Sequence, residues 1–368
     1  MVDLDQITLV AVVILFAGLI GVRTRISSSI FEVLAGIIVA NALGMTLPSW
    51  LDLFGTFGGL VLTFMAGAEV EFVLLKSKAK ESFGIGTMAF VAPLLGIFLF
   101  LTLATDWTFQ ARLAGSLALT TTSVAVVFAV LTEYGIIKVP FARTIIAVTF
   151  VNDILTLIAV NFIAPSFDIY SLLFLLMLAA LVPIVPRLLR IVVRNYGKKA
   201  VEVELRLMIA ILLVVAYLAD EVNLHAVFGA FVLGLIFANS IQGYQDILAK
   251  MRVLTFTLLA PFFFVRAGML IDLSAVIANA GLVFGLLAVK LSSKFVGTYA
   301  LCRRWISEAP MFSTMLFSTG LTVGTIVATL GLNLGFLSPT QFSIVVTAVI
   351  LSAVVPTLIA KRFLPTKL

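Results

Sequence analysis

The sequence predicts an all-α polytopic membrane protein with about thirteen transmembrane helices arranged as inverted repeats. The first observation is composition, because 62% of the 368 residues are hydrophobic and only 11% are charged. The second is that apolar runs of about 20 residues, long enough to span a membrane as helices, follow one another along the chain. The third is the placement of basic residues, which gather at alternate ends of these runs. This pattern excludes an ordinary soluble domain.

The expected spans use nearly the whole length of the chain. The first span is as apolar as a secretion signal, but it lacks a basic segment before it and a small-residue cleavage site, so we expect a retained helix. The single cysteine, Cys302, excludes an intramolecular disulfide. In order, the spans are expected at about 5–21, 28–44, 53–70, 83–104, 112–132, 141–164, 169–193, 204–219, 224–240, 253–271, 276–300, 309–330 and 339–360.

Charge placement predicts the orientation of the chain. The net charge of +6 would suggest a nucleic-acid partner in a soluble protein. Here nearly all Lys and Arg residues fall at one set of span ends, whereas Asp residues occupy many of the opposite ends. The positive-inside rule therefore places the N-terminus outside and the C-terminus in the cytoplasm, in a cell inner (plasma) membrane. Membrane lipid is the expected surrounding, and we expect no nucleic-acid partner.

Two spans are poor continuous helices, and they hold matching places in the two halves. The polar segment 187–206 divides the chain, and a shift of seven spans then pairs the fifth with the twelfth. The fifth holds Thr-Thr-Thr-Ser at 120–123, and the twelfth holds Ser-Thr-Gly-Leu-Thr-Val-Gly at 318–324. Hydroxyl side chains compete for backbone hydrogen bonds, and Gly lowers helix propensity. Broken helices at matching positions indicate a transport site, although the same residues could serve close helix packing.

The polar pair Asn152 and Asp153 is the strongest functional signal. It lies near the middle of an apolar span, where a carboxylate costs at least about 2.5 kcal/mol to insert. In a helix, Thr149, Asn152, Asp153 and Thr156 share one stripe. Their oxygens are hard ligands that suit a small monovalent cation, or a proton in its place. We therefore predict ion binding at Asp153 and Asn152. The alternatives are that the carboxylate only pairs with a buried base and that Asn152 is a structural tie between the broken helices, or has both roles.

Two lysines in the eleventh span, Lys290 and Lys294, stand one helical turn apart. Like charges at this spacing disfavour each other, so we expect different roles. Lys294 could extend to the interface, whereas Lys290 is the better interior candidate, either as a second titrating group or as a fixed cation. Arg266 cannot titrate and is interpreted as a structural ion pair or a vestibule residue.

Several other charged residues are weaker candidates. Glu69 and Glu133 end their spans and could line a funnel that attracts cations, as could Glu32 and Glu71, although solvated interfacial carboxylates are the simpler interpretation. The only histidine, His225, sits at a span end and supports no metal site. Phosphate loops, dinucleotide motifs and catalytic triads are not recognisable, so we expect neither an enzyme nor a bound cofactor.

These residues, in this order, resemble the monovalent cation:proton antiporter superfamily, in the branch with Kef-type and NapA-type exchangers. The resemblance covers essentially the whole chain. Lys290 falls where that family has a core lysine. The matching segments are FEVLAGII at 31–38, LTFMAGAE at 62–69, TTTSVAVV at 120–127, Val-Asn-Asp at 151–153 and HAVFGAFVLGL at 225–235.

The resemblance implies crossed broken helices, a homodimer and an elevator-like motion of a core domain against a scaffold. The core would comprise about 83–164 and 276–360, and the scaffold about 1–70 and 169–271. It implies Na⁺/H⁺ exchange in pH homeostasis, with the cation held by Asp153, Asn152, Thr121, Thr122 and Ser123. Asn152 stands where electrogenic members carry a second aspartate, which favours electroneutral exchange. A K⁺/H⁺ antiporter, a Kef-like regulated K⁺ efflux channel and a separate regulatory subunit remain open alternatives.

Overall fold

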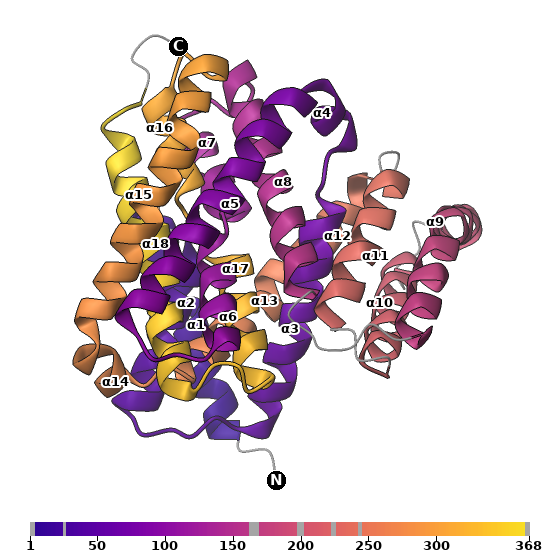
Figure 1. The fold of residues 1–368 in the computed structure, drawn as a ribbon. Helices are drawn as coiled ribbons and strands as arrows, with labels where there is room; N and C mark the ends of the chain where they lie inside the picture. Colours follow the sequence, from indigo (N-terminus) through magenta and orange to yellow (C-terminus); the bar gives the residue numbers. More distant parts are fainter. Residues whose placement is uncertain are drawn as a thin grey trace. The chain divides into compact units, whose positions relative to one another are not determined.

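The computed structural model describes residues 4–24, 27–161, 169–196, 202–221, 226–241 and 245–364 (Figure 1). Among these residues all regular structure is helical, as the sequence predicts. Nine of the described helices or helix pairs are long and apolar enough to cross a membrane, and shorter apolar helices accompany them. His225 lies outside the described residues, so its expected position at a span end stays a prediction.

Each predicted span corresponds to one helix, or to two helices in series. The fifth and twelfth spans are indeed broken, into α6–α7 and α16–α17. The tenth is irregular too, because a π-helical turn, η1, separates α12 from α13. The elements are α1 (Leu4–Thr24), α2 (Ser28–Asn41), α3 (Ser49–Ala68), α4 (Phe72–Ser77), α5 (Ala79–Ala104), α6 (Phe109–Thr120), α7 (Val124–Glu133), α8 (Pro140–Asn161), α9 (Ile169–Tyr196), α10 (Val203–Glu221), α11 (Ala226–Ile241), α12 (Gln245–Leu254), η1 (Thr255–Leu259), α13 (Ala260–Met269), α14 (Leu273–Ala278), α15 (Ala280–Trp305), α16 (Pro310–Phe317), α17 (Thr322–Asn333) and α18 (Pro339–Lys361).

The helices form two compact units. The first comprises Met1–Trp50, Val73–Ile163 and Phe264–Leu368, and the second comprises Leu51–Phe72 and Ala164–Phe263. The first unit contains the segments expected to form a mobile core, and it also contains α1 and α2. The functional division into core and scaffold stays a prediction.

Within the first unit, α5 packs against both α15 and α8. A Cβ on Gly84 would lie 2.6 Å from the Trp305 ring, and one on Gly285 would lie 2.7 Å from the Phe100 ring, so α5 and α15 run antiparallel. The first turn of α5 therefore shares one end of the unit with the last turn of α15. Lys80 and the arginines at 303 and 304 lie at this end.

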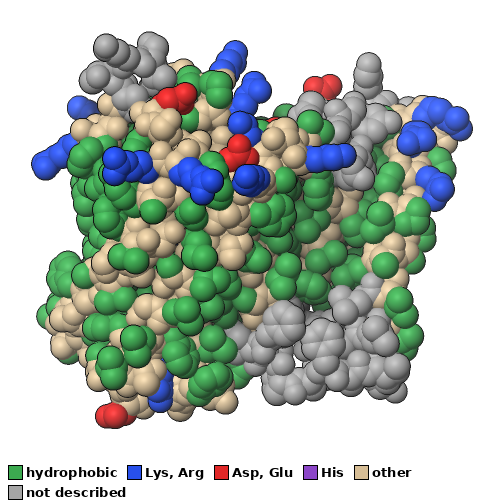
Figure 2. Space-filling view, turned by 45° about the horizontal axis from the view of Figure 1, so that its top comes forward, with side chains coloured by type: hydrophobic (Ala, Val, Ile, Leu, Met, Phe, Trp, Pro, Cys, Tyr) green, Lys and Arg blue, Asp and Glu red, His purple; other side chains and the backbone are tan. Residues whose placement is uncertain are grey.

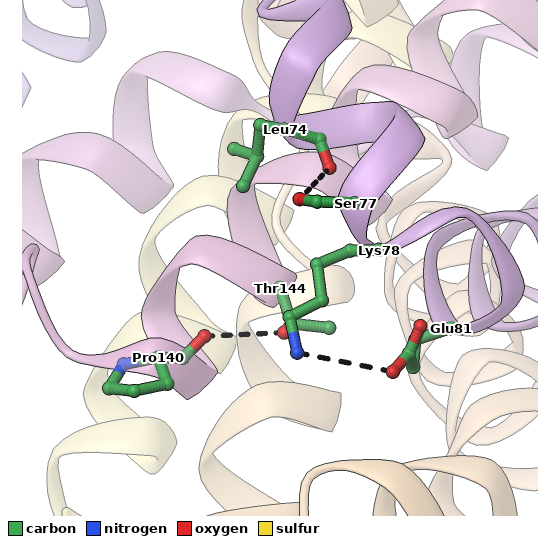
Figure 3. A network of polar contacts seen from close by, with 6 residues as sticks. All are labelled: Leu74, Ser77, Lys78, Glu81, Pro140 and Thr144. Carbon is green, nitrogen blue, oxygen red and sulfur yellow. Dashed lines mark hydrogen bonds and ion pairs between the residues drawn. The ribbon is translucent and has the colours of Figure 1, made fainter.

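The same end carries a polar network at the corner between α4, α5 and α8 (Figure 3). Lys78, just before α5, lies 4.0 Å from the carboxylate of Glu81, and its side chain extends beside Thr144 of α8. The Thr144 hydroxyl donates to the carbonyl of Pro140 at 3.3 Å, and Ser77 donates to Leu74 at 2.9 Å. At the left of Figure 2, Lys and Arg side chains form a row along one edge, next to a broad band of hydrophobic side chains. Clustering of basic groups at one end is what the charge pattern of the sequence predicts.

Two glycine-mediated helix crossings reveal the internal repeat. In the first unit, α2 crosses α13, and a Cβ on Gly36 would lie 2.1 Å from the carbonyl oxygen of Val265. In the second unit, α3 crosses α11, and a Cβ on Gly234 would lie 2.1 Å from the carbonyl oxygen of Phe64. The crossing helices are related in sequence as well: α2 contains LAGIIVAN and α11 contains VLGLIFAN, while α3 and α13 share an Ala-Gly pair. The second and third spans (α2 and α3) thus correspond to the ninth and tenth (α11 and α12–α13), as a shift of seven spans requires.

The close approach at these crossings predicts that a residue larger than glycine destabilises the protein. We expect Gly234→Ala to destabilise the protein by about 1–3 kcal/mol, because the new methyl group would collide with backbone that cannot move aside. Gly18→Ala in α1 is the matched control. Nothing lies within 4 Å of its added Cβ, so the higher helix propensity of Ala should leave stability unchanged or slightly raised. Thermal unfolding in detergent would measure both, and equal stability of the two variants would contradict the close crossing.

The second unit has its own apolar core, contributed by α3, α9, α10, α11 and α12. Phe64 of α3 packs edge-on against Phe237 of α11, with ring centroids 5.5 Å apart. Met208 and Leu212 of α10 and Leu189 of α9 are buried in the same cluster. At one edge of this unit, both carboxylate oxygens of Glu202 accept from Lys250, at 2.7 and 2.6 Å.

Candidate functional site

Helix α8 carries Asn152 and Asp153 into the interior of the first unit. Asp153 is only 4% exposed and Asn152 is fully buried. The two threonines on the same stripe are buried as well, but their hydroxyls bond to their own helix: Thr149 donates to Ile145 at 2.9 Å and Thr156 to the Asn152 carbonyl at 2.9 Å. The stripe therefore offers one carboxylate and one amide, rather than four free ligands.

The two broken helices meet beside this pair. Residues 121–123 are not helical and separate α6 from α7, and 318–321 separate α16 from α17. The backbone N–H of Ser123 donates to the Thr319 carbonyl at 3.1 Å, and the Thr122 hydroxyl donates to the Phe317 carbonyl at 2.8 Å. The two breaks thus provide hydrogen-bond partners for backbone groups that lost their helical partners. Such groups need a partner when they are buried at membrane depth.

Asn152 links this crossing to α8. Its Oδ1 accepts from the backbone N–H of Thr122 at 3.0 Å, so this oxygen is already used by the protein. Its Nδ2 is buried without a hydrogen-bond partner. The oxygen of Asn152 therefore ties α8 to the α6–α7 break, and a role as an ion ligand stays a prediction.

The hydroxyls next to Asn152 are also occupied. Thr121 donates to the Ala118 carbonyl at 3.1 Å. The Ser123 hydroxyl accepts from the backbone N–H of Val126 at 3.3 Å, and so caps the start of α7. A cation at this site would therefore bind mainly through the carboxylate of Asp153, with hydroxyl lone pairs and freed carbonyls as its remaining ligands.

Lys294 faces the site as a charge in the core, and it does not extend to the interface, which was the alternative. It is fully buried in α15, and its Nζ donates to the Thr122 hydroxyl at 3.0 Å. It also attracts Asp153 electrostatically, while the Oδ1 of Asp153 is buried without a hydrogen-bond partner. The physical reason is that α15 packs along α5 with this face inward, so a polar partner inside is nearer than the surface. The carboxylate of Asp153 and the ammonium of Lys294 offset each other's charge in this interior.

Lys290 serves the other break. It is fully buried, and its Nζ donates to Ser352 of α18 at 2.8 Å. Ser352 in turn donates to the carbonyls of Val349 at 2.7 Å and Gly320 at 3.4 Å. A Cβ on Gly320 would meet this Nζ, so a larger residue there would push the ammonium away from the break. The two lysines therefore have different partners, as their spacing predicts.

Ser352 and Gly320 lie next to Lys290 in the site, and the sequence alone did not predict them as its partners. A serine inside the otherwise apolar stretch of α18 was a usable signal for the first. Which helix its hydroxyl would face could not be read from the helix itself.

The remaining candidates lie elsewhere. Glu69, just after α3 in the second unit, accepts from the Nε of Arg252 at 2.9 Å. Burial raises the pKa of Glu69, and the arginine counteracts part of this effect. Arg266 is buried in α13 and Glu32 in α2, whereas Glu71 is exposed. The side chain of Glu133 lies outside what the structure describes. Funnel or vestibule roles for these residues stay predictions.

The arrangement suits a monovalent ion. Among the described residues, His, Cys, Asp and Glu side chains form no group of three that could hold a metal ion. One carboxylate next to hydroxyl and carbonyl oxygens can compensate one positive charge, whether Na⁺, K⁺ or H⁺. Four half-helix ends surround it, and the positive and negative ends of their dipoles can offset each other.

Comparison with known proteins places the chain among transporters. The profile of the transmembrane sodium/hydrogen exchanger family matches residues 10–365. A Na⁺/H⁺ antiporter of Enterococcus hirae is 24% identical, over 93% of this chain and 92% of that protein. The K⁺/H⁺ antiporter 1 of Saccharomyces cerevisiae is also 24% identical, over 91% of this chain but only 43% of that longer protein.

The fold has a solved counterpart. The structure of the sodium proton antiporter MjNhaP1 from Methanocaldococcus jannaschii at pH 8 superimposes with a TM-score of 0.73 at 17% identity. The superposition covers 99% of each chain. At this level of identity, the likeness establishes the fold.

Proposed function

The chain belongs to the family of transmembrane sodium/hydrogen exchangers, and from this premise we propose that it exchanges Na⁺ for H⁺ at Asp153. The single observation that carries the proposal is the buried Asp153 carboxylate, 4% exposed, beside the crossing of two broken helices. Relatives whose names specify Na⁺/H⁺ antiport match nearly the whole chain, which supports the choice of ions.

Competition at one carboxylate is enough to couple the two fluxes. A proton neutralises Asp153, and a cation displaces that proton and takes its place. With either ion bound, the carboxylate is neutralised directly. In the empty site Lys294 attracts it, but one of its oxygens has no hydrogen-bond partner, so the empty site is costlier to carry through the hydrocarbon barrier. Asn152 supports the site by holding the α6–α7 break in place through Thr122. Each cycle therefore returns with one ion or the other, never with an empty site.

The proposed exchange is electroneutral. The amide of Asn152 leaves Asp153 as the single carboxylate of the pair, so one proton balances one Na⁺. Lys290 and Lys294 act as fixed cations in this scheme, bound to Ser352 and Thr122 respectively. If one of them released its proton during the cycle, the exchange would carry net charge.

The remaining features of the proposal concern the whole assembly. The protein acts in a plasma membrane, with the N-terminus outside and the C-terminus in the cytoplasm. It functions as a homodimer, and the segment with the broken helices moves as an elevator against the rest. It needs no cofactor beyond the transported ions and contributes to pH homeostasis.

K⁺/H⁺ exchange is the second candidate. The similarity to a yeast protein named as a K⁺/H⁺ antiporter favours it. The residue types at Asp153 suit both ions, because selectivity depends on cavity size and ligand geometry. A Kef-like regulated K⁺ efflux channel differs in mechanism, because its flux would not need a titratable group.

A liposome assay separates these candidates. The purified protein is reconstituted with an imposed pH gradient, Na⁺ or K⁺ is added outside, and lumenal pH is followed with and without a clamp on the membrane potential. We expect Na⁺ to dissipate the gradient at a rate that the clamp leaves unchanged. A response to K⁺ alone would show that K⁺, and not Na⁺, is the exchanged cation. A rate that depends on the clamp would show that the exchange carries net charge. K⁺ current without proton movement would contradict antiport.

A further inference from the structure

Helix α9 of the second unit is flanked by apolar hollows. One hollow, of about 420 Å³, is lined by Phe72, Val182, Val232, Leu235 and Ile236, from α4, α9 and α11. A smaller one, of about 260 Å³, lies between α9 and α10. Figure 1 shows α9, α10 and α11 side by side. Exchange at Asp153 uses none of these residues.

A hollow of this kind is not expected to stay empty or to fill with water. The five described residues that line it are all apolar, so among them a water molecule would find no side-chain hydrogen-bond partner. An empty hollow would deprive its lining atoms of dispersion contacts on one side. The fitting occupant is a flexible apolar chain, and a bilayer supplies such chains in excess.

Positive charge follows the hollow along α9. Val182 lies near the middle of this 28-residue helix, and exposed Arg187, Arg190 and Arg194 follow it. At 1.5 Å per residue, these arginines lie about 8–18 Å from Val182 along the axis. Half of the hydrocarbon core of a bilayer is about 15 Å thick. The arginines thus lie about as far from Val182 as a lipid phosphate lies from the middle of the bilayer.

We propose that this hollow binds one acyl chain of an anionic phospholipid, whose phosphate contacts the arginines of α9. The alternative occupant, a second copy of this chain, would bring its own row of arginines against the first across a two-fold axis, and like charges would then face each other. A zwitterionic lipid could fill the hollow, but its headgroup offers no net charge to the arginines. The apolar hollow therefore favours an acyl chain, and the arginines favour an anionic headgroup on the same lipid.

Photo-crosslinking of the full-length protein in nanodiscs tests the site. The probe is phosphatidylglycerol with a diazirine in one acyl chain, and cross-linked peptides are mapped by mass spectrometry. We expect labels on the α9 and α11 segments around the hollow, with competition by unlabelled phosphatidylglycerol but not by phosphatidylcholine. Labelling elsewhere only, or equal competition by both lipids, would overturn the proposal.

Variants separate the hollow from the general lipid surface. Val182→Trp fills the hollow and should abolish this labelling, whereas Leu176→Trp, on an exposed part of α9 that lines neither hollow, should not change it. Arg190→Gln should weaken competition by phosphatidylglycerol about fivefold. Unchanged labelling of Val182→Trp, or protein–protein cross-links in place of lipid labels, would contradict lipid as the occupant. The size-exclusion profile and ion exchange of each variant serve as controls for folding.

Discussion

Asp153→Asn is expected to abolish coupled exchange. The amide has nearly the same shape as the carboxylate but can neither bind a proton in this pH range nor compensate a cation. In liposomes, Na⁺ should then leave the imposed pH gradient intact. The variant should fold, because Asn152 and Thr122 keep their hydrogen bond across the helix break.

Two comparisons make this result specific. Asp106→Asn, at an exposed aspartate between α5 and α6, removes the same charge from the surface and should exchange like the unmodified protein. Asp153→Glu keeps the charge but displaces it by one methylene, and should retain a small part of the activity. Cation-dependent proton movement by Asp153→Asn would show that the coupling group lies elsewhere.

Lys294→Met is expected to destabilise the protein by about 3–5 kcal/mol when no cation is bound, because it leaves the buried charge of Asp153 without its counter-ion. The Thr122 hydroxyl also loses the ammonium that donates to it. Added Na⁺ should restore part of the stability, since a bound cation replaces the missing positive charge. Thermal unfolding in detergent, with NaCl or choline chloride, measures both effects.

A double variant isolates the interaction. Asp153→Asn combined with Lys294→Met removes both charges and should be more stable than Lys294→Met alone, because the double variant no longer buries a carboxylate that has lost its counter-ion. Lys80→Met, at an exposed lysine of α5, should change nothing. If the double variant were no more stable than the single one, Lys294 would not compensate Asp153.

The elements that could be predicted from sequence are those encoded within a single helix. Apolar length predicts the spans, and Thr-Ser and Gly runs predict the breaks before α7 and before α17. A carboxylate amid apolar residues predicts Asp153. Each of these signals depends on local propensity or on the cost of burying a charge, and neither needs a partner helix.

The sequence did not predict which neighbouring helix each helix face packs against. The carbonyl oxygen of Asn152 looked available for a cation until the crossing brought the Thr122 N–H against it. Lys294 looked long enough to reach the surface, because nothing in α15 alone shows that its face points inward. The glycine crossings did leave a signal, in the likeness of 34–41 to 232–239, but its meaning depends on seeing Gly36 and Gly234 against neighbouring backbone.

Competition between Na⁺ and H⁺ for one carboxylate is the central claim, and the pH dependence of transport tests it most directly. Exchange rates would be measured on solid-supported membranes over a matrix of Na⁺ concentrations and pH values. Competition predicts that acidification raises the apparent KM for Na⁺, approaching tenfold per pH unit, while the maximal rate at saturating Na⁺ stays constant on the acidic side. A constant KM with a falling maximal rate would mean that the two ions bind at separate sites, and would contradict the mechanism proposed for Asp153.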